Sequence, residues 1–344
     1  MTGNSILFNT LKGIKQHRPP VWLMRQAGRT LPRYMKLREK YSFNELILEP
    51  ELIAQVTLMP VSDLGVDAAI LFSDILVVPQ AAGMKLNFTD KGPVFDSPLK
   101  DCANPAKELK PDISYFQNIF EAIGIINSEK PADIPLIGFC GAPFTVFCYM
   151  MQGKSTSYSF YDAIKFFYSQ PQETERIFDI ITELTIHYAR EQIKHGVDVF
   201  QLFESHAGLL PSDIYEERVL PFIKKIATAV RKTGTPLIFF SKGASAGYAS
   251  IDDETADCVG IDWQTSLWQA RRMIDENIGL QGNFDPRILL TNTKTISSHL
   301  EKFTSFGEHN HNWIFNLGHG LLPETPLENI IFLIDWIKTN NWNR

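Results

Sequence analysis

The chain has 344 residues, a formal net charge of −6 and a sequence pI near 5.8. This acidic balance argues against nucleic acid or an anionic membrane as the main partner, because both carry negative charge. The composition, 44% hydrophobic and 21% charged, is ordinary for a globular protein. No apolar stretch reaches membrane-spanning length without polar interruption, and no leader pattern opens the chain, so we expect a cytoplasmic protein.

Short apolar runs of strand length recur along the whole chain, and polar or small residues follow each of them. The runs are continuously apolar rather than alternating, which is typical of parallel strands covered on both faces. They comprise residues 20–24, 68–72, 135–140, 197–203, 236–240, 258–261, 278–281 and 313–317.

Amphipathic stretches of helical length lie between the runs, among them residues 45–64, 173–195, 215–233 and 325–339. This eightfold alternation favours an α/β fold, a single (β/α)₈ TIM barrel over residues 1–344, rather than an open doubly wound sheet. The stretch from Leu76 to Val94 breaks the rhythm with prolines, glycines and alternating apolar residues. It predicts a hairpin-like insert after the second strand, placed to form a lip over the barrel mouth.

Polar residues gather where the predicted strands end, and in such barrels the chemistry lies at these carboxyl ends. In chain order they include Arg25, Arg29, Ser73, Asp74, Thr145, Tyr149, Glu204, Ser205, His206, Ser241, Lys242, Asp262, Asn283, Asp285 and His319. A cluster of this kind predicts a ligand site at the barrel mouth.

Arg25 and Arg29 directly follow an apolar run and flank Gly28, which allows close backbone approach. Guanidiniums hold carboxylates or phosphates in a fork, so the pair favours an anion-binding pocket. The alternative is that both arginines are solvated or pair with Asp74 or Glu204.

Several other candidates have two readings each. Asp74 either caps a helix or pairs with an arginine, or it faces ligand N–H groups and a developing cation. His319, between two glycines, either binds an anion or is an ordinary loop histidine. Tyr149 either turns its hydroxyl to the mouth or is a half-buried core residue. Ser205 beside His206 indicates hydrogen bonding rather than a nucleophile, because adjacency is not a triad.

The sequence predicts no metal site. The tract Glu308-His309-Asn310-His311-Asn312 precedes a predicted strand, which places it at the barrel end away from the site. The four cysteines contain no CxxC pairing and indicate buried free thiols.

Longer motifs resemble those of the uroporphyrinogen decarboxylase family. Residues 20–29, PVWLMRQAGR, are similar to its N-terminal signature, and residues 138–153, GFCGAPFTVFCYMMQG, to its second signature. Further matches occur in the family's order, at residues 71–76, 202–208, 280–283 and 316–320. Two long signatures in register are far more specific than a lone short motif.

The resemblance implies a single (β/α)₈ barrel, a homodimer, and conversion of the four acetate side chains of uroporphyrinogen III to methyls. The products are coproporphyrinogen III and carbon dioxide, in haem biosynthesis, with no cofactor and no metal. Asp74, Arg25 and Tyr149 are the catalytic residues that it implies. The substrate-binding residues that it implies are Arg25, Gln26, Ala27, Gly28, Arg29, Asp74, Phe139, Tyr149, Phe203, Ser205 and His319.

The chain departs from the family pattern beside these residues. Thr30 and Arg33 stand where tyrosine and glutamate are common, and Gln264-Thr265-Ser266 differs from the usual acidic-containing run. The departures bear on rim contacts or the dimer more than on the chemistry.

Two other functions compete. A corrinoid-linked methyltransferase shares this barrel family but holds zinc through a His-x-Cys element, and here His206 is followed by Ala207 and Gly208. A non-catalytic tetrapyrrole-binding protein is the alternative from a different class. Bound zinc would favour the first, and tight binding without turnover the second.

Overall fold

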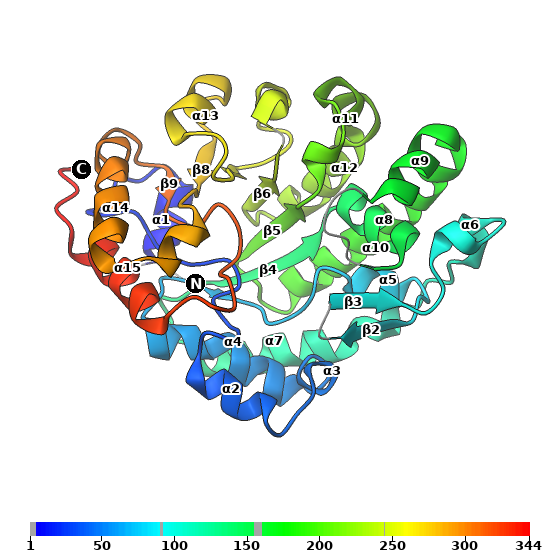
Figure 1. Cartoon of the computed structure of the whole chain (residues 1–344), viewed down its shortest axis with the longest axis horizontal. Coiled ribbons are helices and arrows are strands. Elements are labelled where there is room, and N and C mark those ends of the chain that lie inside the picture. The colour runs from blue at the N-terminus through cyan, green and yellow to red at the C-terminus, as the bar shows by residue number, and fades with distance from the viewer. Residues whose placement is uncertain (1–4, 90–91, 155–159, 244) are drawn as a thin grey trace.

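A curled parallel sheet forms the centre of the computed structural model, which describes residues 5–89, 92–154, 160–243 and 245–344 (Figure 1). Among the described residues, seven strands pair in the order β1-β4-β5-β6-β7-β8-β9, each parallel to its neighbours. Their bounds are β1 (Ala69–Ile70), β4 (Leu136–Gly141), β5 (Val199–Glu204), β6 (Leu237–Ser241), β7 (Cys258–Gly260), β8 (Gly279–Gln281) and β9 (Trp313–Ile314).

Each of the last seven predicted runs contains one of these strands, but the first run does not form a regular strand. Val21 makes an isolated parallel bridge to Phe315, and the Phe315 N–H donates to the Pro20 carbonyl at 2.9 Å. The Asp67 N–H donates to the Val21 carbonyl at 2.8 Å, just before β1. Segment 20–24 therefore bonds to both ends of the sheet, although it turns away too soon to build a ladder.

Helices surround the sheet (Figure 1). The α-helices are α1 (Ile6–Leu11), α2 (Pro32–Arg38), α3 (Phe43–Leu46), α4 (Pro50–Leu64), α5 (Val77–Ala81), α6 (Pro105–Glu108), α7 (Gln117–Glu129), α8 (Pro143–Gln152), α9 (Tyr161–Ser169), α10 (Pro171–Lys194), α11 (Ser212–Arg218), α12 (Leu220–Arg231), α13 (Leu267–Met273), α14 (Thr293–His309) and α15 (Leu327–Thr339). Short 3₁₀ helices are η1 (Leu99–Asp101), η2 (Ile113–Phe116), η3 (Ala207–Leu209), η4 (Ser245–Ser250) and η5 (Pro286–Leu290). None of the described helices is long and apolar enough to cross a membrane.

Prolines divide two of the predicted helices. The stretch 45–64 becomes α3 and α4, because Pro50 opens a new helix at its first position. The stretch 215–233 becomes α11 and α12, with Pro221 in the first turn of α12. The predicted stretches 173–195 and 325–339 correspond closely to α10 and α15.

The stretch from Leu76 to Val94 contains a helix that its sequence did not indicate, α5, followed by two short strands. β2 (Leu86–Thr89) pairs antiparallel with β3 (Gly92–Phe95). Helix α5 was not predicted, because Val77-Val78-Pro79 has no helical periodicity of its own. Burial of Val77, Val78 and Ala81 stabilises this helix.

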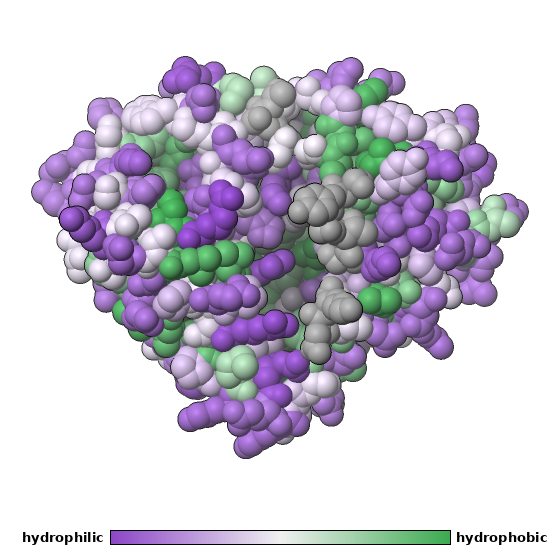
Figure 2. Space-filling view, viewed as in Figure 1, coloured by the Kyte–Doolittle hydropathy of each residue, from purple (hydrophilic) through white to green (hydrophobic). Residues whose placement is uncertain are grey.

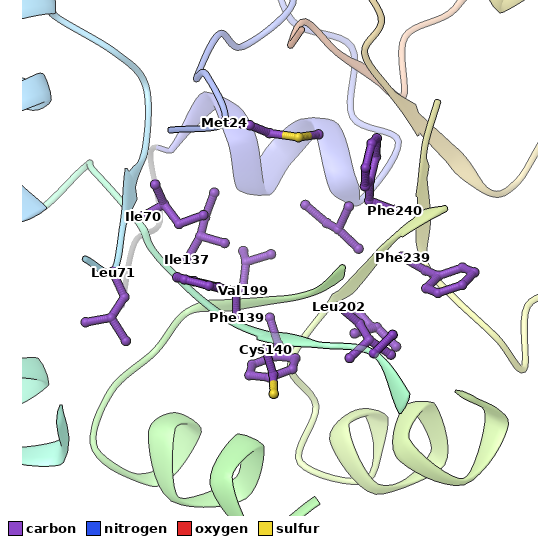
Figure 3. Close-up of a cluster of buried hydrophobic side chains, with 14 of the residues drawn as sticks. Met24, Ile70, Leu71, Ile137, Phe139, Cys140, Val199, Leu202, Phe239 and Phe240 are labelled. Atoms are coloured by element: carbon purple, nitrogen blue, oxygen red, sulfur yellow. The ribbon is translucent and has the colours of Figure 1, made fainter. Parts of the chain in front are cut away.

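The interior of the sheet is packed with apolar side chains that alternate between its two faces. Phe239 and Phe240 are successive residues of β6, and they point to opposite sides of the strand (Figure 3). The same period-2 geometry separates Phe139 from Cys140 on β4. One face of each strand therefore packs under helices, while the other faces the inside of the curled sheet.

A buried ion pair fixes the start of the sheet. Arg18 meets Asp67 with two hydrogen bonds, of 2.6 and 2.9 Å, and Asp67 also accepts the Val21 N–H at 2.8 Å. Both side chains are nearly buried, and Lys338 lies 3.9 Å from the other side of the same carboxylate. This pair holds segment 20–24 beside β1.

Candidate functional site

A cavity of about 610 Å³ lies at the carboxyl ends of the central strands, and Figure 2 shows this face of the molecule hollowed there. Its volume is within the range of small-molecule sites, about 300–1,000 Å³. The lining residues include Met24, Arg25, Ala27, Gly28, Arg29, Thr30, Tyr34, Arg38, Phe43, Phe72, Asp74, Phe88, Thr89, Gly92, Phe139, Phe203, Ser205, Phe240, His319 and Gly320.

The turn that carries Arg25 is held from two sides. The buried side chain of Gln26 accepts the Leu23 N–H at 3.0 Å and donates to the Ala68 carbonyl at 3.0 Å. Asn316, beyond β9, accepts the Met24 N–H at 3.0 Å. Gln26 does not occur among the lining residues, so the structure gives it the role of holding the turn rather than a place at the cavity.

Arg25 has a positive φ of 62°, which is uncommon for a residue with a side chain and costs conformational energy. Arg25 and Arg29 are both exposed, and both line the cavity with Arg38 of α2. Within the described parts of the chain, none of these three guanidiniums has a carboxylate within ion-pair distance. Three unpaired cations on one wall make the cavity attractive to an anion.

Asp74 follows β1 and is the acidic residue among the described lining residues. One of its oxygens accepts the Leu76 N–H at 2.8 Å. Burial raises the pKa of Asp74 to about 6, while the hydrogen bond and the charge of Arg25 oppose that rise. The side chain is therefore mostly a carboxylate at neutral pH and becomes neutral in mild acid. Asp74 therefore caps the turn that follows it and lines the cavity, while its role toward a ligand stays a prediction.

Aromatic rings from three neighbouring strands form one apolar wall. The Phe139 and Phe203 rings meet edge to face with centroids 5.6 Å apart, and those of Phe203 and Phe240 lie 5.9 Å apart. All three residues line the cavity. Phe139 and Phe203 were predicted from the sequence, whereas Phe240 was not, because nothing local distinguishes it from Phe239.

Ser205 lines the cavity, and the two residues beside it in sequence make a buried network. Glu204 accepts the Thr145 N–H at 2.7 Å and is also hydrogen-bonded by the Thr145 hydroxyl. The His206 N–H donates to the same hydroxyl at 3.2 Å. Burial raises the pKa of Glu204 to about 7. The network ties the end of β5 to the start of α8.

His319 lines the cavity next to Phe240, with ring centroids 6.5 Å apart. Burial and the nearby charges of Arg25 and Lys242 lower its pKa to about 3. At neutral pH the ring is therefore uncharged and offers a hydrogen bond rather than a positive charge.

Tyr149 of α8 does not occur among the described lining residues. Its ring lies 5.1 Å from that of Phe160 and 5.4 Å from that of His206, measured between centroids. These contacts place Tyr149 beside His206, the residue that follows Ser205 in the chain. The structure thus brings the arginines, Asp74, the two phenylalanines, Ser205 and His319 to one cavity, with Ala27 and Gly28, and sets Gln26 and Tyr149 outside its lining.

Sequence reasoning missed the contribution of the segment after Arg29. Tyr34 and Arg38 of α2, Phe43 of α3 and Phe88 of β2 all line the cavity. Of these residues, only Arg38 could have been suspected from the sequence. Tyr34 and Arg38 lie four residues apart and therefore share one face of a helix. Phe43 and Phe88 reach the cavity only through tertiary packing, with ring centroids 4.7 Å apart.

The positions that depart from the family pattern have separate surroundings. Thr30 lines the cavity, whereas Arg33 pairs with Asp63 at 2.7 Å on the exposed side of α2. Gln264 is exposed, and Ser266 caps α13 in a capping box.

No group of three or more His, Cys, Asp or Glu side chains with metal-binding geometry occurs among the described residues. The tract from Glu308 to Asn312 ends α14 and precedes β9, at the amino end of that strand. The ring nitrogen of His309 contacts the Ser305 carbonyl at 2.9 Å.

Comparison with known proteins places this site in a family. Residues 2–340 match the family model described as uroporphyrinogen decarboxylase (URO-D). The chain is 41% identical over 333 residues to uroporphyrinogen decarboxylase of Syntrophotalea carbinolica, covering 96% of each chain. It is 39% identical over 341 residues to that of Flavobacterium johnsoniae, covering 98% of this chain and 99% of the relative.

Solved structures agree in fold. A methyltransferase from Methanosarcina mazei superposes with a TM-score of 0.79 at 22% identity, over 97% of this chain and 98% of the other. At that identity the likeness concerns the fold alone. The family match over nearly the whole length and the two relatives decide the matter: this chain belongs to the uroporphyrinogen decarboxylase family.

Proposed function

We propose that this protein decarboxylates the four acetate side chains of uroporphyrinogen III to methyls, releasing carbon dioxide and coproporphyrinogen III in porphyrin biosynthesis. Family membership supports the reaction. The observation that carries it at the site is the composition of the cavity. It has guanidiniums with no carboxylate partner among the described residues, phenylalanine rings, and Asp74. A reduced tetrapyrrole has a matching apolar body, pyrrole N–H groups and a carboxylate rim.

The arginines and the phenylalanine rings of the cavity bind different parts of the substrate. Arg25 and Arg29, both exposed to the cavity, bind carboxylates of the rim through charge-assisted hydrogen bonds. Phe139 and Phe203 contact the apolar body. His319 and Ser205 add neutral hydrogen bonds, since the pKa of His319 lies far below neutrality.

Asp74 is the centre of the chemistry. Its carboxylate accepts the pyrrole N–H groups of the bound ring. Loss of carbon dioxide requires an electron sink, and protonation of a pyrrole carbon makes the ring itself that sink. A carboxylate beside the ring stabilises this cation more than it stabilises the neutral substrate, which is catalysis by differential electrostatic binding. Carbon dioxide then leaves, and the electron pair of the broken bond forms an exocyclic methylene. Protonation of this methylene gives the methyl group, and loss of the proton first added to the pyrrole carbon restores the pyrrole ring.

Arg25 lies near Asp74, as its effect on the Asp74 pKa indicates, and its guanidinium orients the reacting acetate. The proton donor is Arg25, His319, Tyr149 or a water. An arginine is a weak acid, so Arg25 serves as a relay rather than as the ultimate source. A direct role for Tyr149 stays a prediction, because Tyr149 is not among the described lining residues.

We further propose that residues 1–344 form one domain, a closed (β/α)₈ barrel. Segment 20–24 takes the place of the eighth strand in this barrel. The bonds from Phe315 to Pro20 and from Asp67 to Val21 support the closure. The β2–β3 pair, with Phe88 and Gly92 in the lining, acts as the predicted lip of the mouth. Absence of a cofactor, a homodimer and a cytoplasmic location stay predictions of the sequence.

The direct test is anaerobic incubation of the purified protein with uroporphyrinogen III. We expect carbon dioxide release and formation of coproporphyrinogen III, measured by chromatography after oxidation. Tight binding without carbon dioxide would instead indicate a tetrapyrrole-binding protein. Stoichiometric zinc in the purified protein would revive the methyltransferase alternative.

A further inference from the structure

Lys242 lies just beyond the strand that carries the lining residue Phe240, and hydrogen bonds hold its backbone. It directly follows β6, and its N–H donates to the Glu204 carbonyl at 3.0 Å. Its own carbonyl accepts the Gly208 N–H at 2.9 Å. Phe240, two residues earlier on the same strand, lines the cavity. The half-buried Lys242 side chain therefore starts where the β6 wall of the cavity ends.

The ammonium group of Lys242 lies over the ring of Trp263, which contacts a residue of the cavity lining. Its nitrogen is 5.5 Å from the centroid of the Trp263 ring. Trp263 in turn contacts His319, with centroids 6.2 Å apart, and His319 lines the cavity. The charge of Lys242 lowers the pKa of both His206 and His319, so the ammonium is within electrostatic reach of both.

Nothing described in the structure neutralises this charge. Among the described residues no carboxylate lies within ion-pair distance of Lys242. The nearby Asp262 is buried and instead accepts the backbone N–H groups of Gly243 and Gln264, at 2.5 and 2.8 Å. A partly buried ammonium without a counter-ion favours an anionic ligand.

Arg287 can be compared with Lys242, because its guanidinium lies over the same Trp263 indole. Its guanidinium carbon is 5.3 Å from the Trp263 centroid. Unlike Lys242, Arg287 pairs with Asp285 through contacts of 2.6 to 3.1 Å. Of these two cations over one ring, Lys242 acts on the pKa of His319, and it has no carboxylate partner among the described residues.

Lys242 and the arginine turn lie on different walls. β6 is the middle strand of the seven, with three strands on each side of it, whereas segment 20–24 bonds to both ends of the sheet. Because the sheet is curled, its middle faces the place where its ends approach each other (Figure 1). Arg25 and Arg29 therefore face Lys242 across the mouth, with His319 between them.

We propose that Lys242 binds a peripheral carboxylate of the tetrapyrrole substrate, on the wall facing Arg25 and Arg29. This inference rests on the proposed function, since it concerns the same cavity. A substrate with carboxylates around its whole rim is held at both sides only if cations stand on both walls. Lys242 supplies the second side, and the indole of Trp263 keeps its ammonium beside His319.

The test compares four proteins in the anaerobic assay: wild type, Lys242→Met, Lys242→Arg and Arg287→Met. We expect Lys242→Met to raise KM for uroporphyrinogen III about tenfold, because a charge-assisted hydrogen bond is lost, while kcat stays within about threefold. Lys242→Arg keeps KM within about threefold of wild type. Arg287→Met, the matched control, leaves KM within about twofold, because Asp285 already neutralises that charge.

An unchanged KM in Lys242→Met, or an equal rise in Arg287→Met, would overturn the assignment. Melting temperatures of all variants check folding, and Lys242→Gln replaces Lys242→Met if the latter is unstable. Wild-type protein that releases no carbon dioxide contradicts the proposed function as a whole. Active wild-type protein with an unaffected Lys242→Met variant contradicts the Lys242 assignment alone.

Discussion

Arg25 lies across the space that a β-carbon of residue 320 would occupy. A methyl group built on Gly320 contacts the Cγ, Cδ and Nε atoms of Arg25 too closely for both to remain. Gly320 follows His319 in the loop after β9, and the Leu321 N–H donates to the Met24 carbonyl at 2.9 Å. The loop after the last strand therefore positions the arginine that follows the first predicted run.

Gly320→Ala tests this relationship. The added methyl displaces the Arg25 side chain, which is flexible, so we expect a folded protein whose KM for uroporphyrinogen III rises about tenfold through loss of one charge-assisted bond. The control is Gly124→Ala in α7, where a methyl group meets nothing within 4 Å. A KM unchanged in Gly320→Ala, measured by initial rates under anaerobic conditions, would contradict a binding role for the observed Arg25 conformation.

Asp74→Asn separates binding from chemistry. The amide keeps the shape and the bond from the Leu76 N–H but removes the negative charge. We expect kcat to fall by about 100-fold or more, as for loss of one electrostatic stabiliser, with product affinity little changed. Asp63→Asn, which breaks the exposed pair with Arg33, serves as the control and leaves turnover within about twofold. Near-wild-type turnover in Asp74→Asn removes the cation-stabilising role.

The pH dependence of the reaction follows from the same residue. The pKa of Asp74 is raised to about 6, and the active form is the carboxylate. We therefore expect kcat/KM to be highest above pH 6 and to fall about tenfold per pH unit well below it. Because the charge of Arg25 opposes the rise, Arg25→Met moves this limb to higher pH. A fall in kcat/KM centred near pH 4 in wild type would contradict this assignment. So would a fall whose pH Arg25→Met leaves unchanged.

Glu204 makes stability depend on pH. Its pKa is raised from 4.5 to about 7, so between these values the folded state holds a proton that the unfolded state releases. The free energy of unfolding of wild type therefore falls relative to Glu204→Gln as pH rises from 4.5 to 7, by up to about 1.4 kcal/mol per pH unit.

Denaturant unfolding of both proteins across this pH window measures that difference. Glu45→Gln is a control of opposite sign, because hydrogen bonds from Ser42 lower the pKa of Glu45. Its stabilising contribution is present above the unfolded pKa and is lost as pH falls. A flat difference between wild type and Glu204→Gln would show that Glu204 ionises in the folded state as it does in the unfolded one.

Much of the fold was readable from the chain. Continuous apolar runs located seven of the strands in the sheet, because strands buried on both faces need apolar residues at every position. The run at 20–24 was wrong as a strand, since its length and composition match the others but Arg25 turns out of the ladder with a positive φ. Helix α5 was missed for the converse reason, because packing rather than periodicity stabilises it.

For the site, the sequence by itself determined which chemical groups stand at the strand ends. Motifs 20–29 and 138–153 pointed to the family, and Arg25, Asp74 and His319 were found because each lies within two residues of the end of an apolar run. Such positions are local properties of the chain, since strand direction fixes which end a following residue occupies.

Only the tertiary structure decided which of these groups share a cavity and in what state of charge. It set Gln26 and Tyr149 behind the lining, brought Phe88 to it, and left Lys242 without a counter-ion among the described residues. Burial and the field of distant residues are sums over the whole fold, so no local pattern encodes them. Arg25 and Asp74 belong to two different loops, and the tertiary structure alone brings the charge of Arg25 close to Asp74.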